Sequence, residues 1–297
     1  MNKAMVAAST FKRLLENALN VSRAHEDEVL NWQGLVKAKV GGQELCLPGY
    51  IPYIGSKYFD SETEGCRILA YALSQNLRPD CGLAIRWAED WHKGDGMMAL
   101  DRQNMGYASG DRRAEMHPFD TGHIPVLCAL LRWLVRKGLS PISSGIYDEI
   151  AATNLSKFSF RTADKKRTTD KMDSLQRCWE WFSKEEIEVL QPDFILCAGN
   201  DVYHVVSSGL KELKGREYDG PRALKVAFPS LQVINRYCGK KPIGKHLTTN
   251  DILELLSDDD IKHPADYKDR TLGDIVKRDT HYFAEMHSSI KDQLSCK

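Results

Sequence analysis

The 297-residue chain lacks the sequence signatures of several common functional classes. It has no run of about 18 apolar residues, so no membrane-spanning helix is expected. None of its eight cysteines form a CxxC pair, which argues against a zinc ribbon. GxGxxG, GxxxxGK[ST] and GxSxG are also missing. The usual dinucleotide and phosphate cradles, and the nucleophile elbow of many hydrolases, are therefore not expected.

The chain also lacks an excess of charge, because 41 Lys and Arg residues balance 41 Asp and Glu residues. A nucleic-acid partner would have to be held by local basic segments. The N-terminal segment 1–19 contains Arg13 and Glu16, and its pattern predicts an amphipathic helix, not a signal peptide. We therefore expect a cytoplasmic, monomeric, soluble protein with reduced cysteines.

Short apolar runs alternate with helical patterns along the chain. Strands are predicted at residues 67–73, 147–153, 193–198 and 223–228. Helices are predicted at residues 11–19, 126–135, 172–190, 202–213, 252–256 (with Thr249 as N-cap) and 271–294. This alternation indicates an α/β fold with an open four-stranded parallel sheet flanked by helices. We expect one domain over 1–297, with a core at about 61–240 and helical extensions at 1–60 and 241–297.

Amides and small hydroxyls follow the predicted strands, at the sheet edge where ligands bind in open α/β folds. They are Ser74, Gln75 and Asn76, then Asn154, then Asn200, then Ser230. An Asn side chain offers a donor and an acceptor side by side, which suits the edge of a flat heterocycle. The alternative is that these residues serve only as local turn formers.

Four motifs, taken in order and spacing, resemble the uracil-DNA glycosylase superfamily. They are PFDTGHIPVLCALL (118–131), ATNLSK (152–157), LQPDFILCAGNDVYHVV (190–206) and FPSLQVIN (228–235). The chain is most similar to the branch with a T-N-x-x-K motif, and RILAYALSQN (67–76) stands where the first family motif belongs. The resemblance covers about residues 67–235 and implies that family's fold.

The resemblance also implies roles for individual residues. Asn154 matches the Asn that hydrogen-bonds a flipped-out base, and Phe119 matches the aromatic residue that stacks on it. Pro229 and Ser230 match the loop that grips the DNA strand, and Leu231 extends it as an apolar wedge.

Several positions depart from the family pattern. The first motif has no carboxylate, so the water-positioning role falls to Ser74, Gln75 or Asn76, with Asp111 and Glu115 as alternatives. The last motif has Phe228 where the family has His; His92, His117 and His123 are the candidate substitutes. Cys178 matches one iron–sulfur ligand of this branch, but Phe158 replaces another. We therefore expect no cluster, no metal and no other cofactor.

An insertion at 77–117, rich in Trp, Tyr and Arg, separates the first motif from Phe119. It favours an enlarged pocket for a modified base, such as those in viral DNA, and hence a role in antiphage defence. The alternative is a solvent-exposed insertion without a role in substrate binding. Basic stretches at 161–171 and 236–246 flank the motif loops and are expected to contact DNA phosphates; the alternative is a solvated charged surface. Lys157, Lys240 and Lys241 are the predicted DNA-binding lysines.

The sequence therefore predicts a monofunctional DNA glycosylase that hydrolyses the N-glycosidic bond of an unusual base and leaves an abasic site. DNA is the expected partner. The alternative is a non-catalytic nucleic-acid-binding module that keeps the base pocket. A hydrolase of free nucleosides is a third possibility, and the basic loops argue against it.

Overall fold

A computed structural model of the chain describes eleven segments. They are residues 3–32, 35, 37–45, 52–60, 65–73, 122–136, 146–158, 172–214, 220–227, 248–255 and 271–296. The chain divides into two compact units, each assembled from separate stretches of sequence. The first comprises residues 1–53, 73–118 and 153–191, and the second residues 54–72, 119–152 and 192–297. Within the described segments, no helix combines the length and hydropathy needed to cross a membrane.

A five-stranded, mostly parallel sheet contains all four predicted strands. Its order is β3 (Tyr53–Ile54), β5 (Ile150–Asn154), β4 (Ile68–Ala72), β6 (Phe194–Ala198) and β7 (Arg222–Val226). Strands β4 and β6 pair in parallel, as do β6 and β7. The prediction of four strands was wrong by one, because β3 has only two residues and carries no periodic signal. The short helix α6 (Ile146–Glu149) takes the first residues of the predicted second strand.

The sequences of the inner strands explain their position. Strand β4 (ILAYA) and strand β6 (FILCA) are apolar at nearly every residue, and both are buried along almost their full length. Such continuous apolar runs are typical of strands covered on both faces. Strand β7 lies last in the sheet, and its partly exposed residues agree with that edge position.

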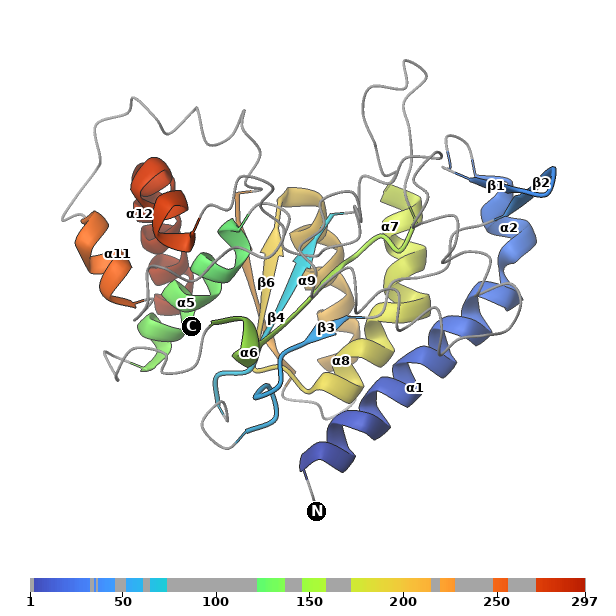
Figure 1. The fold of residues 1–297 in the computed structure, drawn as a ribbon, viewed down its shortest axis with the longest axis horizontal. Helices are drawn as coiled ribbons and strands as arrows, with labels where there is room; N and C mark the ends of the chain where they lie inside the picture. Colours follow the sequence, from blue (N-terminus) through green and yellow to red (C-terminus); the bar gives the residue numbers. More distant parts are fainter. Residues whose placement is uncertain are drawn as a thin grey trace. The chain divides into compact units, whose positions relative to one another are not determined.

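Helices of the second unit pack on the sheet (Figure 1). Helix α5 (His123–Arg136) contacts β4, and α9 (Asn200–Lys214) contacts β6 and β7. The C-terminal helix α12 (Leu272–Ser295) contacts α5 and β7, and it begins with a capping box between Thr271 and Asp274. These contacts confirm the predicted α/β class with helices flanking the sheet.

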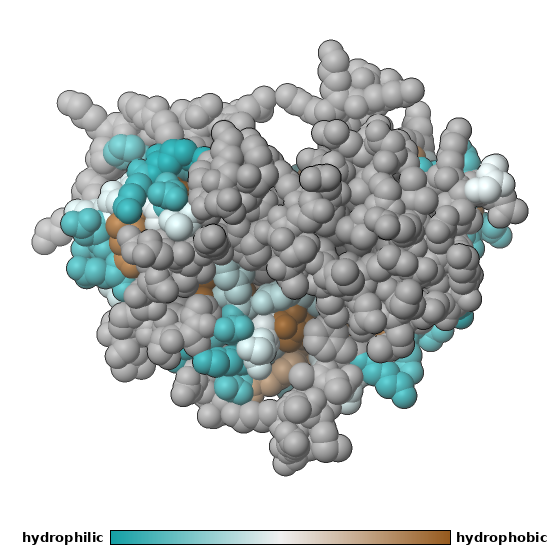
Figure 2. All heavy atoms as spheres, viewed as in Figure 1, coloured by the Kyte–Doolittle hydropathy of each residue, from teal (hydrophilic) through white to brown (hydrophobic). Residues whose placement is uncertain are grey.

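Helix α11 (Thr249–Leu255) packs on α5 and α12. Its N-cap is Thr248, one residue before the predicted Thr249: the Thr248 hydroxyl accepts from the Asp251 amide at 3.2 Å. Exposed positions of α11 and of the start of α12 carry charged side chains such as Glu254 and Lys277, and this surface is hydrophilic in Figure 2.

The first unit combines helices with a small hairpin. Helix α1 (Lys3–Ala24) packs on α8 (Lys184–Leu190) and on the π-helical segment η3 (Trp179–Ser183), which follows α7 (Met172–Cys178). The short helix α2 (Glu26–Leu30) comes next along the chain. Strands β1 (Ala38–Val40) and β2 (Gln43–Leu45) then pair antiparallel. Gly41 and Gly42 form their turn at φ values of 56° and 87°, which few residues other than glycine adopt. This hairpin was not expected in the helical extension at 1–60.

Candidate functional site

Asn154 is the last residue of β5, and its side chain is nearly buried at 6% exposure. Among the described residues, its amide does not belong to the fully buried polar atoms that lack a hydrogen-bond partner. An amide at the carboxyl end of a strand, with a few per cent of its surface exposed, can present a donor and an acceptor to a ligand.

The turn after Asn154 is fixed by hydrogen bonds. The Ser156 amide donates to the Leu73 carbonyl at 2.9 Å, and the Ser156 hydroxyl donates to the Phe158 carbonyl at 2.6 Å. Leu73 directly follows β4 and directly precedes Ser74 in the sequence. The structure thus places the turn after Asn154 next to Leu73, the residue directly before the predicted water-positioning residues Ser74, Gln75 and Asn76.

Lys157 is fully buried just beyond this turn. Its ammonium donates to the Thr153 hydroxyl at 3.0 Å and lies 2.5 Å from a carboxylate oxygen of Glu186 on α8. Glu186 is also buried, with a side-chain exposure of 4%. A lysine without solvent exposure does not reach a phosphate, so the prediction that Lys157 contacts DNA needs correction. Its ammonium instead ties the end of β5 to α8.

Phe158 belongs to an aromatic cluster in the same unit. Its ring makes edge contacts with Trp32 at 5.5 Å and with Phe182 at 6.2 Å between centroids. Phe158 is 1% exposed and packs as a core residue. Cys178, which was predicted to match an iron–sulfur ligand position, is a buried free thiol. Across the described segments, no group of three His, Cys, Asp or Glu side chains is arranged to hold a metal ion.

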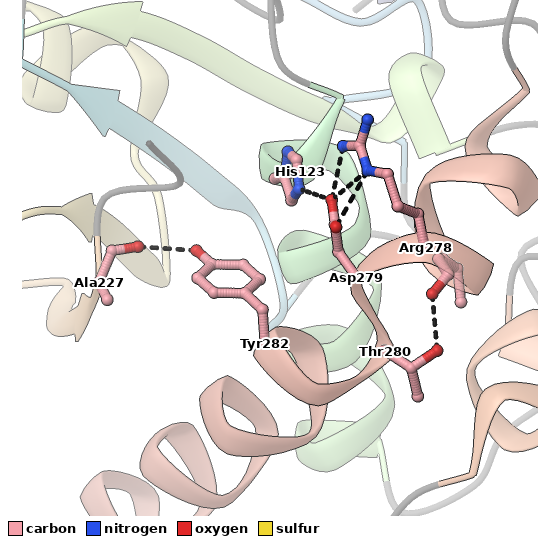
Figure 3. Close-up of polar contacts among 7 residues, drawn as sticks. His123, Ala227, Arg278, Asp279, Thr280 and Tyr282 are labelled. Carbon is pink, nitrogen blue, oxygen red and sulfur yellow. Dashed lines mark hydrogen bonds and ion pairs between the residues drawn. The ribbon is translucent and has the colours of Figure 1, made fainter. Parts of the chain in front are cut away.

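A second buried polar cluster lies in the other unit, where α12 meets α5 (Figure 3). His123 Nε2 and Asp279 Oδ2 are 2.8 Å apart, and their side chains are only 3% and 4% exposed. The Arg278 guanidinium approaches both oxygens of Asp279, with distances of 3.0 Å from Nε and 2.5 Å from Nη2. The His123 ring also stacks on Phe283 at 5.4 Å.

Electrostatics keep the Asp279 carboxyl ionised. Burial alone would raise its pKa, but hydrogen bonds from His123 and Arg278 outweigh burial and lower the pKa to about 2. Asp279 also interrupts α12, with φ −114° and ψ 25° inside the helix. Sequence reasoning offered His123 as a candidate catalytic residue but missed Asp279, since nothing in a helical pattern marks a local kink.

Only part of the predicted site falls within the described residues. Asn154 and Lys157 are described, as above. The remaining predicted site residues lie outside the described segments: Ser74, Gln75, Asn76, Phe119, Pro229, Ser230, Leu231, Lys240 and Lys241. The insertion at 77–117 lies outside them as well.

Comparison with protein-family models and with curated proteins finds no match for this chain.

Proposed function

We propose that the protein is a monofunctional DNA glycosylase acting on an unusual or modified base. The observation that carries this proposal is the nearly buried Asn154 at the carboxyl end of β5. Such an amide gains two hydrogen bonds when it pairs with the edge of a base. The order and spacing of the sequence motifs around Asn154 support the same assignment.

The proposed reaction is hydrolysis of the N-glycosidic bond of a flipped-out nucleotide. Phe119 stacks on the base, while Asn154 hydrogen-bonds its edge. A water held near Ser74, Gln75 or Asn76 attacks the anomeric carbon. The carbon–nitrogen bond breaks as the base leaves with the electron pair, through an oxocarbenium-like state. The oxygen of the water forms the new bond to the anomeric carbon and gives up one proton to solvent, and the departing base takes up one proton. The hydrogen bond between Ser156 and Leu73 supports this scheme, because it joins the two segments that would cooperate.

DNA is the proposed partner. Pro229, Ser230 and Leu231 would grip and wedge the duplex, because extrusion of a nucleotide leaves a gap for an apolar side chain. Lys240 and Lys241 would contact phosphates, which predicts binding that weakens steeply as salt concentration rises. The insertion at 77–117 makes a bulky modified base, as in phage DNA, the preferred substrate class, and this favours a role in antiphage defence.

A second candidate is a nucleic-acid-binding module without hydrolysis. Two features of the sequence favour it. The segment Ser74 to Asn76 holds no carboxylate, and Phe228 stands where the resembled family has a histidine. An amide or a hydroxyl can position a water, but neither readily deprotonates it at neutral pH. The two candidates share the base pocket and differ only in turnover.

The test measures abasic-site formation on uracil DNA, unmodified DNA and phage DNA with modified cytosines. Asn154→Ala is compared with Asn250→Ala, which changes an exposed asparagine on α11. We expect wild type and Asn250→Ala to act on at least one substrate, and Asn154→Ala to be about 10- to 100-fold slower, as expected for loss of a bidentate contact. If no substrate is cleaved but salt-sensitive binding depends on Asn154, the binding module is favoured. Absence of both activities would refute both candidates.

A further inference from the structure

The outer edge of β7 is covered by side chains of α12 instead of another strand. β7 is the last strand of the sheet, and an exposed edge would leave its peptide groups unpaired. The Gln293 side chain accepts from the Lys225 amide at 2.7 Å and donates to the Lys225 carbonyl at 2.8 Å. Two residues further along, α12 engages the backbone of Ala227 in the same way.

Both backbone groups of Ala227 are bound by α12. The Tyr282 hydroxyl donates to the Ala227 carbonyl at 2.7 Å, and the Met286 sulfur accepts from the Ala227 amide at 3.2 Å. Tyr282 is fully buried and Met286 is 4% exposed, so water does not compete for these contacts. Ala227 is the last described residue before Phe228, where the motif FPSL begins. The end of β7 is therefore fixed from outside the sheet.

The preceding turn of the same helix holds the beginning of α5. Asp279 lies three residues before Tyr282 and is 2.8 Å from the His123 ring. His123 is the first residue of α5, and Gly122 before it has a φ of 66°. The kink at Asp279 lets the carboxylate point toward His123 while Tyr282 points toward Ala227 (Figure 3). Phe119 lies only four residues before His123 in the sequence.

We infer that residues 279–286 of α12 form a brace that fixes the start of α5 at His123 and the end of β7 at Ala227. The chain continues from these two positions to Phe119 in one direction and to Phe228 in the other. Asp279 and Tyr282 are the positioning residues of the brace. The catalytic part of this inference rests on the proposed function, which assigns base stacking to Phe119 and duplex opening to residues 229–231. Tyr282 holds the backbone of Ala227, and Asp279 holds the ring of His123, the first residue of α5.

The brace has a direct structural test that needs no substrate. Tyr282→Phe keeps the buried ring and removes only the hydroxyl, and Asp279→Asn keeps the shape and removes the charge. Tyr203→Phe is the matched control, because Tyr203 lies on α9 of the same unit and belongs to neither contact. Hydrogen exchange of backbone amides is followed in the intact protein at residues 123–128 and 226–227. We expect about tenfold faster exchange at 226–227 in Tyr282→Phe and at 123–128 in Asp279→Asn, with no change in the control. Equal exchange in all four proteins would overturn the brace.

The catalytic consequence is measured with the same variants. Under single-turnover conditions we expect base release to slow by about tenfold in Tyr282→Phe, while the Kd for a duplex with an abasic site stays within about twofold of wild type. Faster exchange with an unchanged rate of base release would overturn the positioning role. If wild type forms no abasic sites on any substrate, the proposed function fails, and hydrogen exchange alone then decides whether the brace exists. Should Asp279→Asn fail to fold, Tyr282→Phe carries both measurements, because it removes a single oxygen atom.

Discussion

The buried ion pair between Lys157 and Glu186 provides a sharp test of the structure beneath Asn154. Lys157→Met removes the ammonium but keeps a long apolar side chain in a position with no solvent exposure. It removes the ammonium that lies 2.5 Å from the Glu186 carboxylate, whose side chain is 4% exposed. Removal of one partner from a buried pair costs about 3–5 kcal/mol, a large share of the roughly 5–15 kcal/mol that stabilises a typical protein.

Urea unfolding at pH 7 and 25 °C measures this cost. The control is Lys184→Met, because Lys184 pairs with Glu180 on an exposed helix surface, where such pairs contribute about 0–1 kcal/mol. The double variant Lys157→Met with Glu186→Leu removes both charges, and we expect it to recover most of the lost stability. A single variant within about 1 kcal/mol of wild type would refute the reasoning. So would a double variant no more stable than Lys157→Met.

Three further predictions concern the second unit. Gly55→Ala would place a Cβ only 2.3 Å from the backbone of Asp148, so we expect its free energy of unfolding in urea to fall by about 2–4 kcal/mol. The control is Gly65→Ala, in open space at φ +73°, for which we expect a loss of only about 1 kcal/mol. Burial, with a smaller contribution from a nearby lysine, lowers the pKa of His287 to about 4. The unfolded chain therefore binds a proton that the folded chain does not. We expect the free energy of unfolding of wild type to fall by about 1–2 kcal/mol between pH 7 and pH 5, and that of His287→Phe to lack this decrease. Arg222 donates to carbonyls in the last turn of α12, so Arg222→Ala should speed amide exchange at that end by about tenfold, and unchanged exchange would contradict its capping role.

The layered α/β fold was predictable because its inner strands are short apolar runs. The four predicted strands lie within a few residues of β4, β5, β6 and β7. Strand β3 was not predictable, since two residues contain no period. The hairpin β1–β2 has three-residue strands and escaped notice for the same reason, although the Gly41-Gly42 pair is a recognised turn signal between strands.

The candidate site was predictable only in part. Asn154 was placed correctly at a strand end, because the apolar run stops there, but its burial depends on packing that no local pattern contains. Lys157 was expected on the surface because lysines are rarely buried without a partner. Its partner, Glu186, lies 29 positions away, beyond the reach of any motif. Likewise, the contacts of Asp279 and Tyr282 join segments more than 50 positions apart.

In the proposed reaction, the Asn154 amide reads a flipped-out base before its glycosidic bond is hydrolysed. The most direct test is single-turnover abasic-site formation by wild type and by Asn154→Ala on phage DNA with modified cytosines, with unmodified DNA of the same sequence as the reference. We expect abasic sites only in the modified DNA, formed about 10- to 100-fold more slowly by Asn154→Ala. Equal rates for the two proteins would contradict the role of Asn154. No abasic sites in any DNA, including uracil DNA, would contradict the glycosylase itself.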